Sequence, residues 1–104
     1  MAEGGSMILE LATLNVKPGK EKLFEETFSE AQKIISGMEG YISHQLHKCI
    51  ENSNKYILLV NWQNLEDHTI GFRGSEKYRE WSKLLHHFYD PFPVVEHYTS
   101  LTYK

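Results

Sequence analysis

Cysteine is almost absent from this chain of 104 residues, in which Cys49 is the single example. One cysteine excludes a disulfide framework and a thiolate metal cluster within one chain. No spacing pairs Cys49 with a histidine as a nucleophile, so we expect it to fill space at a strand end. A reducing compartment is the simplest interpretation, and we expect a cytoplasmic protein.

The sequence also has no excess of basic residues, no long apolar run and no glycine-rich phosphate loop. Lys and Arg number 11 against 14 Asp and Glu, and a net charge of −3 makes nucleic acid and anionic membranes poor partners. The apolar stretches are too short to span a bilayer. No dinucleotide-binding motif is present, so we expect neither flavin nor nicotinamide as a cofactor.

The length is that of one ordinary domain with one hydrophobic core. Residues 1–6 (MAEGGS) are small and polar and precede a second methionine, Met7. We expect this segment to be disordered, either as a remnant of cloning or as a natural ragged start, and we assign the domain to residues 7–104.

Hydrophobic periodicity predicts strands and helices in alternation along the domain. Phe24, Phe28, Ala31 and Ile35 recur at helical spacing, and Gly37 follows them. The predicted strands cover residues 7–16, 41–50, 55–63 and 94–103. The predicted helices cover about 21 to 37 and Ser75 to about 88, and a short helix is predicted to begin at Asn64. Asn64 and Ser75 are candidate N-caps.

The element order strand, helix, strand, strand, helix, strand is that of an α+β, ferredoxin-like βαββαβ fold, with one antiparallel sheet and helices on one face. The third strand carries apolar side chains on both faces, with Ile57 and Leu59 on one and Tyr56, Leu58, Val60 and Trp62 on the other. Two helices cover only one face. A second copy of the chain is the economical cover for the other, so we predict a homodimer.

The end of the third strand and the short helix after it provide the candidate site. Trp62 could cross a cleft mouth and aim its N–H at a ligand, or it could be a core plug. His68 lies one helical turn before Phe72, so both point to the same side. Histidine exchanges a proton near neutral pH, and we predict His68 as the catalytic group; the alternative is a histidine on the helix surface.

Aromatic and polar side chains complete the predicted substrate site. Tyr78 and Trp81 belong to an aromatic stripe that is often simply a core face, yet flat aromatic substrates are gripped by such rings. Asn15, Asn61 and His44 are strand residues that could orient substrate or simply face solvent. Arg73, between two glycines, could attract an anionic substrate or merely be solvated.

Six histidines raise the question of a metal site. His86 and His87 are adjacent on a helix and point about 100° apart. His44 and His47 are three apart on a strand and face opposite sides. Neither pair is a natural chelate, so we predict no metal.

Together these residues resemble the antibiotic biosynthesis monooxygenase domains of the dimeric α+β barrel superfamily, over almost the whole chain from Met7. The resemblance is carried by the Lys17-Pro18-Gly19 turn, Gly40-Tyr41, Asn61-Trp62, Asp67-His68, and then Ser75 and Tyr78 before the final strand. It implies a cofactor-independent monooxygenase in which His68 helps to deprotonate a phenolic or quinol-type small aromatic that then reacts with O₂.

The resemblance leaves other functions open. The haem-degrading branch uses an asparagine, a tryptophan and a haem-ligating histidine, where rough alignment places Leu11 or Ala12, Phe72, and Trp81 or Ser82. Haem degradation is therefore not expected. A dimeric ligand-binding module without catalysis, or an isomerase or processing enzyme for a small signalling molecule, would use the same histidine and aromatic side chains.

Overall fold

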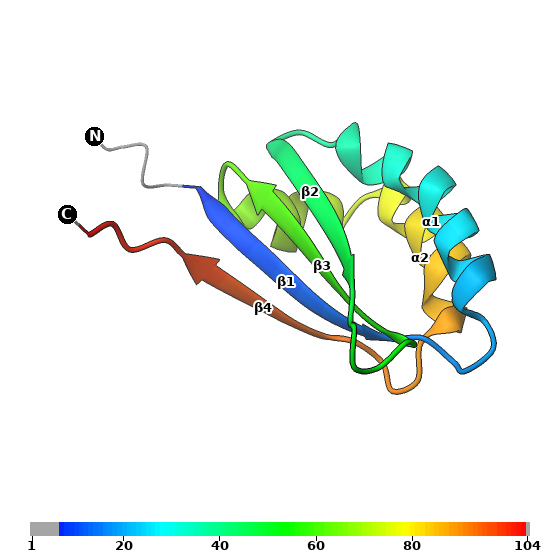
Figure 1. The fold of residues 1–104 in the computed structure, drawn as a ribbon. Helices are drawn as coiled ribbons and strands as arrows, with labels where there is room; N and C mark the ends of the chain where they lie inside the picture. The colour runs from blue at the N-terminus through cyan, green and yellow to red at the C-terminus, as the bar shows by residue number, and fades with distance from the viewer. Residues whose placement is uncertain (1–6, 104) are drawn as a thin grey trace.

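The computed structural model describes residues 7–103, and the prediction for residues 1–6 lies outside this range. A four-stranded antiparallel sheet in the order β2-β3-β1-β4 forms one layer, and the two long helices pack over one of its faces (Figure 1). The predicted α+β, ferredoxin-like arrangement is confirmed. The strands are β1 (Ile8–Asn15), β2 (Tyr41–Lys48), β3 (Lys55–Trp62) and β4 (Val94–Thr99), and the helical elements are α1 (Glu21–Ser36), η2 (Asp67–Phe72), α2 (Glu76–Leu85) and η3 (His86–Phe88).

Period-two alternation in β1 and β3 separates a buried face from a half-buried one. Leu14 is 2% exposed and Val60 is fully buried, whereas their neighbours in sequence are only half-buried. Phe24 and Ile35 of α1, and Trp81 and Leu85 of α2, close the core from the other side. The hydrophobic core therefore lies between the sheet and the helices.

Strand β2 departs from the alternation that the sequence predicts. A register shift between Tyr41 and Ser43 places both Tyr41 and His44 on the helix-facing side, where Tyr41 packs against the core. Alternation over residues 41–50 predicts one apolar face shared by Ile42, Leu46 and Ile50. Ile42 is instead 43% exposed, and Ile50, which lies beyond the end of β2, is 94% exposed. A bulge adds one residue to a strand and so reverses the side on which every preceding residue lies.

The two helical segments that follow β3 also have distinct starts. Ser75 caps α2 as predicted, because its Oγ accepts a hydrogen bond from the Tyr78 backbone N–H at 3.1 Å. Asn64 was expected to cap the short helix with its side chain. Instead the Asp67 carboxylate accepts a hydrogen bond from the Asn64 backbone N–H at 3.1 Å. The six residues from Asp67 to Phe72 form a π-helix, η2, whose wider turns bury His68 and Phe72 together.

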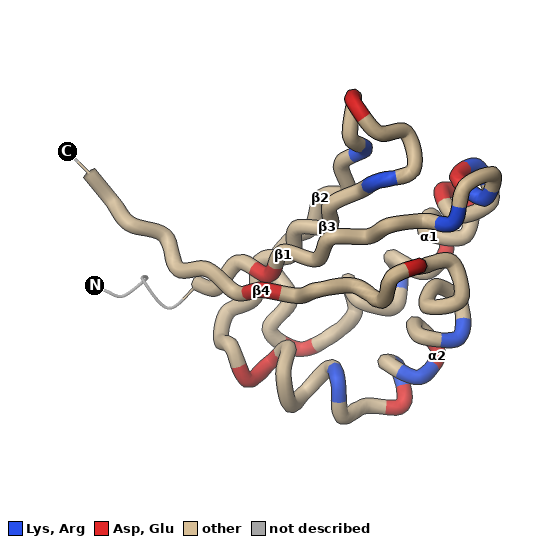
Figure 2. The backbone as a smooth tube through the Cα atoms, turned by 90° about the horizontal axis from the view of Figure 1, so that it is seen from below, with Lys and Arg blue, Asp and Glu red and all other residues tan. Residues whose placement is uncertain are grey.

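Within residues 7–103, no helix packs on the second face of the sheet (Figure 1). Leu9, Leu11, Ile57 and Leu59 lie on it, half-buried, and Tyr98 of β4 is 45% exposed there. Charged residues are sparse along the strands and concentrate in the helices and the β2–β3 turn (Figure 2). No helix within residues 7–103 has the length and apolarity to cross a membrane.

Candidate active site

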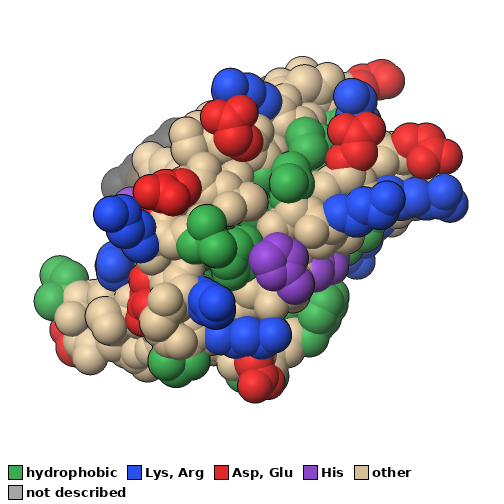
Figure 3. All heavy atoms as spheres, turned by 90° about the vertical axis from the view of Figure 1, so that its right-hand side faces the viewer, with side chains coloured by type: hydrophobic (Ala, Val, Ile, Leu, Met, Phe, Trp, Pro, Cys, Tyr) green, Lys and Arg blue, Asp and Glu red, His purple; other side chains and the backbone are tan. Residues whose placement is uncertain are grey.

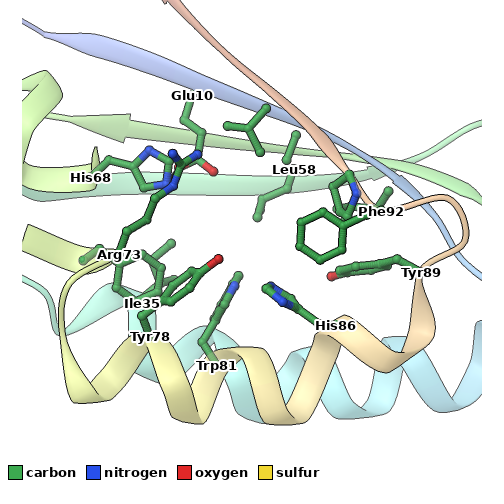
Figure 4. Close-up of a pocket in the computed structure, with 15 residues that line it drawn as sticks. Glu10, Ile35, Leu58, His68, Arg73, Tyr78, Trp81, His86, Tyr89 and Phe92 are labelled. Carbon is green, nitrogen blue, oxygen red and sulfur yellow. The ribbon is translucent and has the colours of Figure 1, made fainter. Parts of the chain in front are cut away.

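A pocket of about 400 Å³ lies between the helix-facing side of the sheet and the segment from η2 to β4. Most of its lining is apolar or aromatic, and Glu10, His68 and Arg73 gather at one end (Figure 4). The lining residues are Glu10, Ala12, Leu14, Ile35, Leu58, His68, Phe72, Arg73, Tyr78, Trp81, His86, Tyr89, Phe92, Pro93 and Val95. An apolar cavity with a few convergent polar groups is the usual form of a small-molecule site.

Glu10 is the central polar group of this pocket. It occupies a helix-facing position in β1, and it is 5% exposed. The Trp62 indole N–H donates to Glu10 Oε1 at 2.9 Å, and His68 Nε2 lies 3.4 Å from the same oxygen. Burial raises the pKa of Glu10 to about 6, although the Trp62 hydrogen bond and the positive charge of Arg73 oppose the rise. Glu10 therefore exchanges a proton close to neutral pH.

His68 is buried between Glu10 and a second histidine. Its ring stacks on Trp62 with centroids 5.4 Å apart, and its Nδ1 lies 2.8 Å from Nε2 of His97 in β4. Burial lowers the pKa of His68 to about 3, and Arg73 and His97 reinforce the effect. The imidazole is consequently neutral at pH 7, with one ring nitrogen facing each neighbour.

Aromatic rings form the wall next to this polar end. Phe72 and Tyr78 meet edge to face at 5.2 Å, and Phe72 and Trp81 do so at 5.7 Å. Ser75 fixes this wall from both sides, since its Oγ donates to the Phe72 carbonyl at 2.6 Å and accepts from the Tyr78 N–H. The sequence between the two helices thus sets the spacing of the rings that would contact an aromatic ligand.

The opposite end of the pocket is formed by η3 and the loop before β4. His86 contacts Phe92 at a centroid distance of 5.0 Å, and Phe92 is 64% exposed. Burial lowers the pKa of His86, so this histidine is neutral at pH 7. Figure 4 shows Phe92, Tyr89 and His86 facing the Glu10 end across the cavity. Because Phe92 is exposed, it lies at the mouth.

Four of the predicted site residues come together here. His68, Phe72, Tyr78 and Trp81 all line the pocket. Trp62 does not reach the cavity: it is fully buried behind His68, with its N–H on Glu10. Trp62 is therefore a core side chain, and its N–H binds a pocket residue instead of pointing across the cleft mouth at a ligand.

The three predicted strand polars lie elsewhere. Asn61 is on the helix-free face and donates to Ser43 Oγ at 3.1 Å. Asn15 is at the far end of β1 from Glu10. His44 faces α1, where its Nε2 lies 2.9 Å from Gln32 Oε1. None of the three is among the residues that line the pocket.

Glu10 and His97 are the site residues that sequence reasoning missed. No motif in the sequence singles out Glu10, although it is flanked by apolar residues and shares a face with Ala12 and Leu14. A charged residue on the buried face of a strand is rare unless it is paired, so this position was a usable signal. His97 gave no such signal, because its importance depends on its pairing with β1.

The surface near the helices carries both signs of charge. Figure 3 shows acidic and basic side chains interspersed around hydrophobic side chains and histidines on this face. Within residues 7–103, no group of three or more His, Cys, Asp or Glu side chains is arranged to hold a metal ion.

Comparison with known proteins identifies the family. A model described as antibiotic biosynthesis monooxygenase matches residues 7–84. The chain belongs to this family. The Bacillus subtilis (strain 168) protein YczJ is 59% identical over 92 residues, which cover 88% of this chain and 97% of that protein.

Solved structures agree with this assignment. A structure from Bordetella bronchiseptica, described as a candidate antibiotic biosynthesis monooxygenase, is 32% identical, covers 93% of this chain and 99% of its own, and has a TM-score of 0.89. SnoaB from Streptomyces nogalater, a cofactor-independent oxygenase, is 14% identical, with 95% of each chain covered and a TM-score of 0.73. That likeness to SnoaB concerns the fold alone.

Proposed function

We propose that this member of the antibiotic biosynthesis monooxygenase family oxidises a small phenolic or quinol-type aromatic with O₂ and without a cofactor. The observation that carries the proposal is the acid–base pair of Glu10 and His68 at the end of an aromatic pocket. Family membership supports an oxygenase, and the SnoaB fold likeness is consistent with a cofactor-independent one.

The proposed reaction begins with loss of the phenolic proton to the Glu10–His68 pair. The pKa of Glu10 at about 6 suits a base that works near pH 7, whereas neutral His68 with a pKa of about 3 is the weaker acceptor. His68, predicted as the catalytic group, acts in this proposal with Glu10. The resulting phenolate is electron-rich enough to reduce O₂.

The overall change balances without an external reductant. A quinol and O₂ give a hydroxyquinone and water: one oxygen atom enters the ring, and the other leaves with two hydrogens from the substrate. The substrate itself supplies all four electrons. The protein's part is to remove the proton, hold the ring against the aromatic wall of Phe72, Tyr78 and Trp81, and exclude water.

The size and charge of the pocket favour a compact, acidic substrate. A volume of about 400 Å³ is near the lower end of ligand cavities, which suits one or two rings. Arg73 extends toward Glu10 and His68 at the polar end (Figure 4). Its guanidinium would attract a phenolate or a ring carboxylate.

Oxygen consumption with a panel of quinols tests the proposal. We expect uptake of O₂ by the purified protein, and a fall of at least about 100-fold in rate for His68→Ala, the usual scale for loss of acid–base catalysis. His87→Ala is the matched control, because His87 is exposed and lies outside the pocket lining. Unaltered turnover by His68→Ala would refute the assigned role. Binding of quinols without O₂ uptake would indicate a ligand-binding module instead.

A homodimer is part of the same proposal. The apolar side chains on the helix-free face, Leu11 and Leu59 among them, would be covered by a second sheet. Sedimentation of the purified protein should give twice the chain mass, and Leu11→Glu should shift it toward the monomer. Leu23→Glu is the control, since Leu23 is 52% exposed on α1. A monomeric wild-type protein would contradict this part alone.

A further inference from the structure

Glu10, His68 and His97 are three titratable side chains that lie in succession from the pocket to the edge of the sheet. Glu10 and His68 line the pocket, whereas His97 lies outside the lining, half-buried on the edge strand β4. His68 Nε2 is 3.4 Å from Glu10 Oε1, and His68 Nδ1 is 2.8 Å from His97 Nε2. Each ring nitrogen of His68 thus faces one of the other two groups.

The fold holds this line in place from three elements. Glu10 and His97 are directly opposite in the β1–β4 register, on the helix-facing side of the sheet. His68 is placed against them by η2, and its ring is held by stacking on Trp62 at an interplanar angle of 19°. Trp62 also fixes Glu10 through its indole N–H. Each of the three side chains would lose a hydrogen bond if it left this position.

We propose that Glu10, His68 and His97 form a proton relay that exchanges the proton of Glu10 with water at the edge of the sheet. This inference rests on the proposed function in one respect: Glu10 takes up the substrate proton, and the relay would return that proton to water before the next turnover. During catalysis the substrate and the aromatic rings would separate this buried carboxylate from solvent in the pocket, so a path to the edge of the sheet would serve to reset it.

Proton transfer along the relay balances at each atom. With Glu10 ionised, His97 and His68 each carry their proton on Nε2. A proton from water binds His97 Nδ1, the Nε2 proton of His97 moves to His68 Nδ1, and the Nε2 proton of His68 moves to Glu10 Oε1. Both imidazoles end neutral, with the proton on Nδ1. The reverse sequence releases one proton to water.

Two features of the environment favour this path. Burial and the charge of Arg73 disfavour the imidazolium form of both histidines, so the proton does not rest on either ring. Arg73 is the charged group that faces the trio from outside it. The gap of 3.4 Å at Glu10 is longer than a good hydrogen bond, as catalytic contacts often are before substrate binds.

Nuclear magnetic resonance of ¹⁵N-labelled histidine in the full chain tests the relay without any substrate. Above the midpoint of Glu10 we expect His68 and His97 to carry the proton on Nε2. As the pH falls through that midpoint, both should switch to Nδ1 together, at the same pH at which the Glu10 carboxyl signal titrates. Exposed His87 provides an internal reference.

Glu10→Gln gives the decisive comparison, because its amide oxygen can still accept from Trp62 but cannot take up a proton. We expect the switch in both histidines to disappear while the rest of the spectrum is retained. The proposal is overturned if the tautomers still switch in this variant, or if His97 instead becomes an imidazolium with its own midpoint in the wild type.

This experiment separates the relay from the oxygenase. A coupled switch without O₂ uptake by any quinol would retain the relay and reject the proposed reaction. O₂ uptake without a coupled switch would do the opposite. In an active protein, His97→Gln should slow turnover by about 10-fold or more at low buffer concentration, and small buffer acids that reach the pocket should restore part of the rate.

Discussion

The indole N–H of Trp62 donates to the carboxylate of Glu10 at 2.9 Å, joining two buried residues that are 52 positions apart in the sequence. This hydrogen bond stabilises the ionised carboxylate against the effect of burial. It also holds the oxygen that faces His68. The relationship ties the central strands of the sheet to the polar end of the pocket.

Trp62→Phe should therefore raise the pKa of Glu10 above about 6, because the main interaction that opposes burial is lost. The free energy of unfolding should fall by about 1.5–3 kcal/mol, as expected for a hydrogen bond to a charged group. Carboxyl ¹³C titration and urea unfolding measure the two effects. The Glu25 carboxyl is the internal control, since its lowered pKa depends on Tyr56 and Lys48. An unchanged Glu10 midpoint would contradict the prediction.

Stability should depend on pH in opposite directions through Glu10 and His68. Between pH 4.5 and about 6 the folded protein holds a proton on Glu10 that the unfolded chain has released, so stability falls as pH rises. Between about 3 and 6.5 the unfolded chain holds a proton on His68 that the folded protein lacks, so stability rises with pH. Each group changes the free energy of unfolding by at most about 1.4 kcal/mol per pH unit.

Single variants should separate these slopes. Relative to the wild type, Glu10→Gln should gain stability with increasing pH from 4.5 to about 6. His68→Phe should lose stability relative to the wild type as pH rises from about 3 to 6.5. Urea unfolding at half-unit pH steps gives both differences. Parallel curves for wild type and variants would show that neither group is perturbed by folding.

Gly40 should tolerate substitution less well than Gly19, although both have positive φ, +83° and +87°. A Cβ at Gly40 would overlap the Asp67 carboxylate, which accepts from Asn64 at the start of η2. Gly19→Ala meets only backbone strain of about 1–2 kcal/mol. Gly40→Ala should cost more in thermal or urea unfolding and should disturb the His68 imidazole signals. Equal losses in the two variants would argue against the Gly40–Asp67 contact.

Arg73→Gln should weaken the preference for acidic substrates. The change should raise the pKa values of both Glu10 and His68, since the positive charge of Arg73 lowers each of them. Binding of 2,5-dihydroxybenzoate relative to hydroquinone should fall by up to about fivefold, because Arg73 is exposed and its ion pairs are screened. Arg79→Gln is the control, as Arg79 is exposed on α2 beside Glu76. An unchanged ratio would remove Arg73 from substrate selection.

The sequence by itself determined the elements and one wall of the pocket. Local periodicity sufficed for the order of strands and helices, because the side-chain repeats of 2 and 3.6 residues are properties of the segment alone. The same local spacing put His68 and Phe72 on one side, and Tyr78 and Trp81 on one helical face. Ser75 was recognisable as a cap for the same reason.

The tertiary structure alone decided how the acid–base cluster is assembled. Glu10 meets His97 only through the β1–β4 register, and it meets Trp62 only because β1 pairs with β3. The bulge in β2 turned Tyr41 toward the core and left Ile42 exposed, against the expected alternation. Register and bulges arise from pairing between distant segments, and so do the burial and neighbouring charges that set the pKa values of Glu10 and His68.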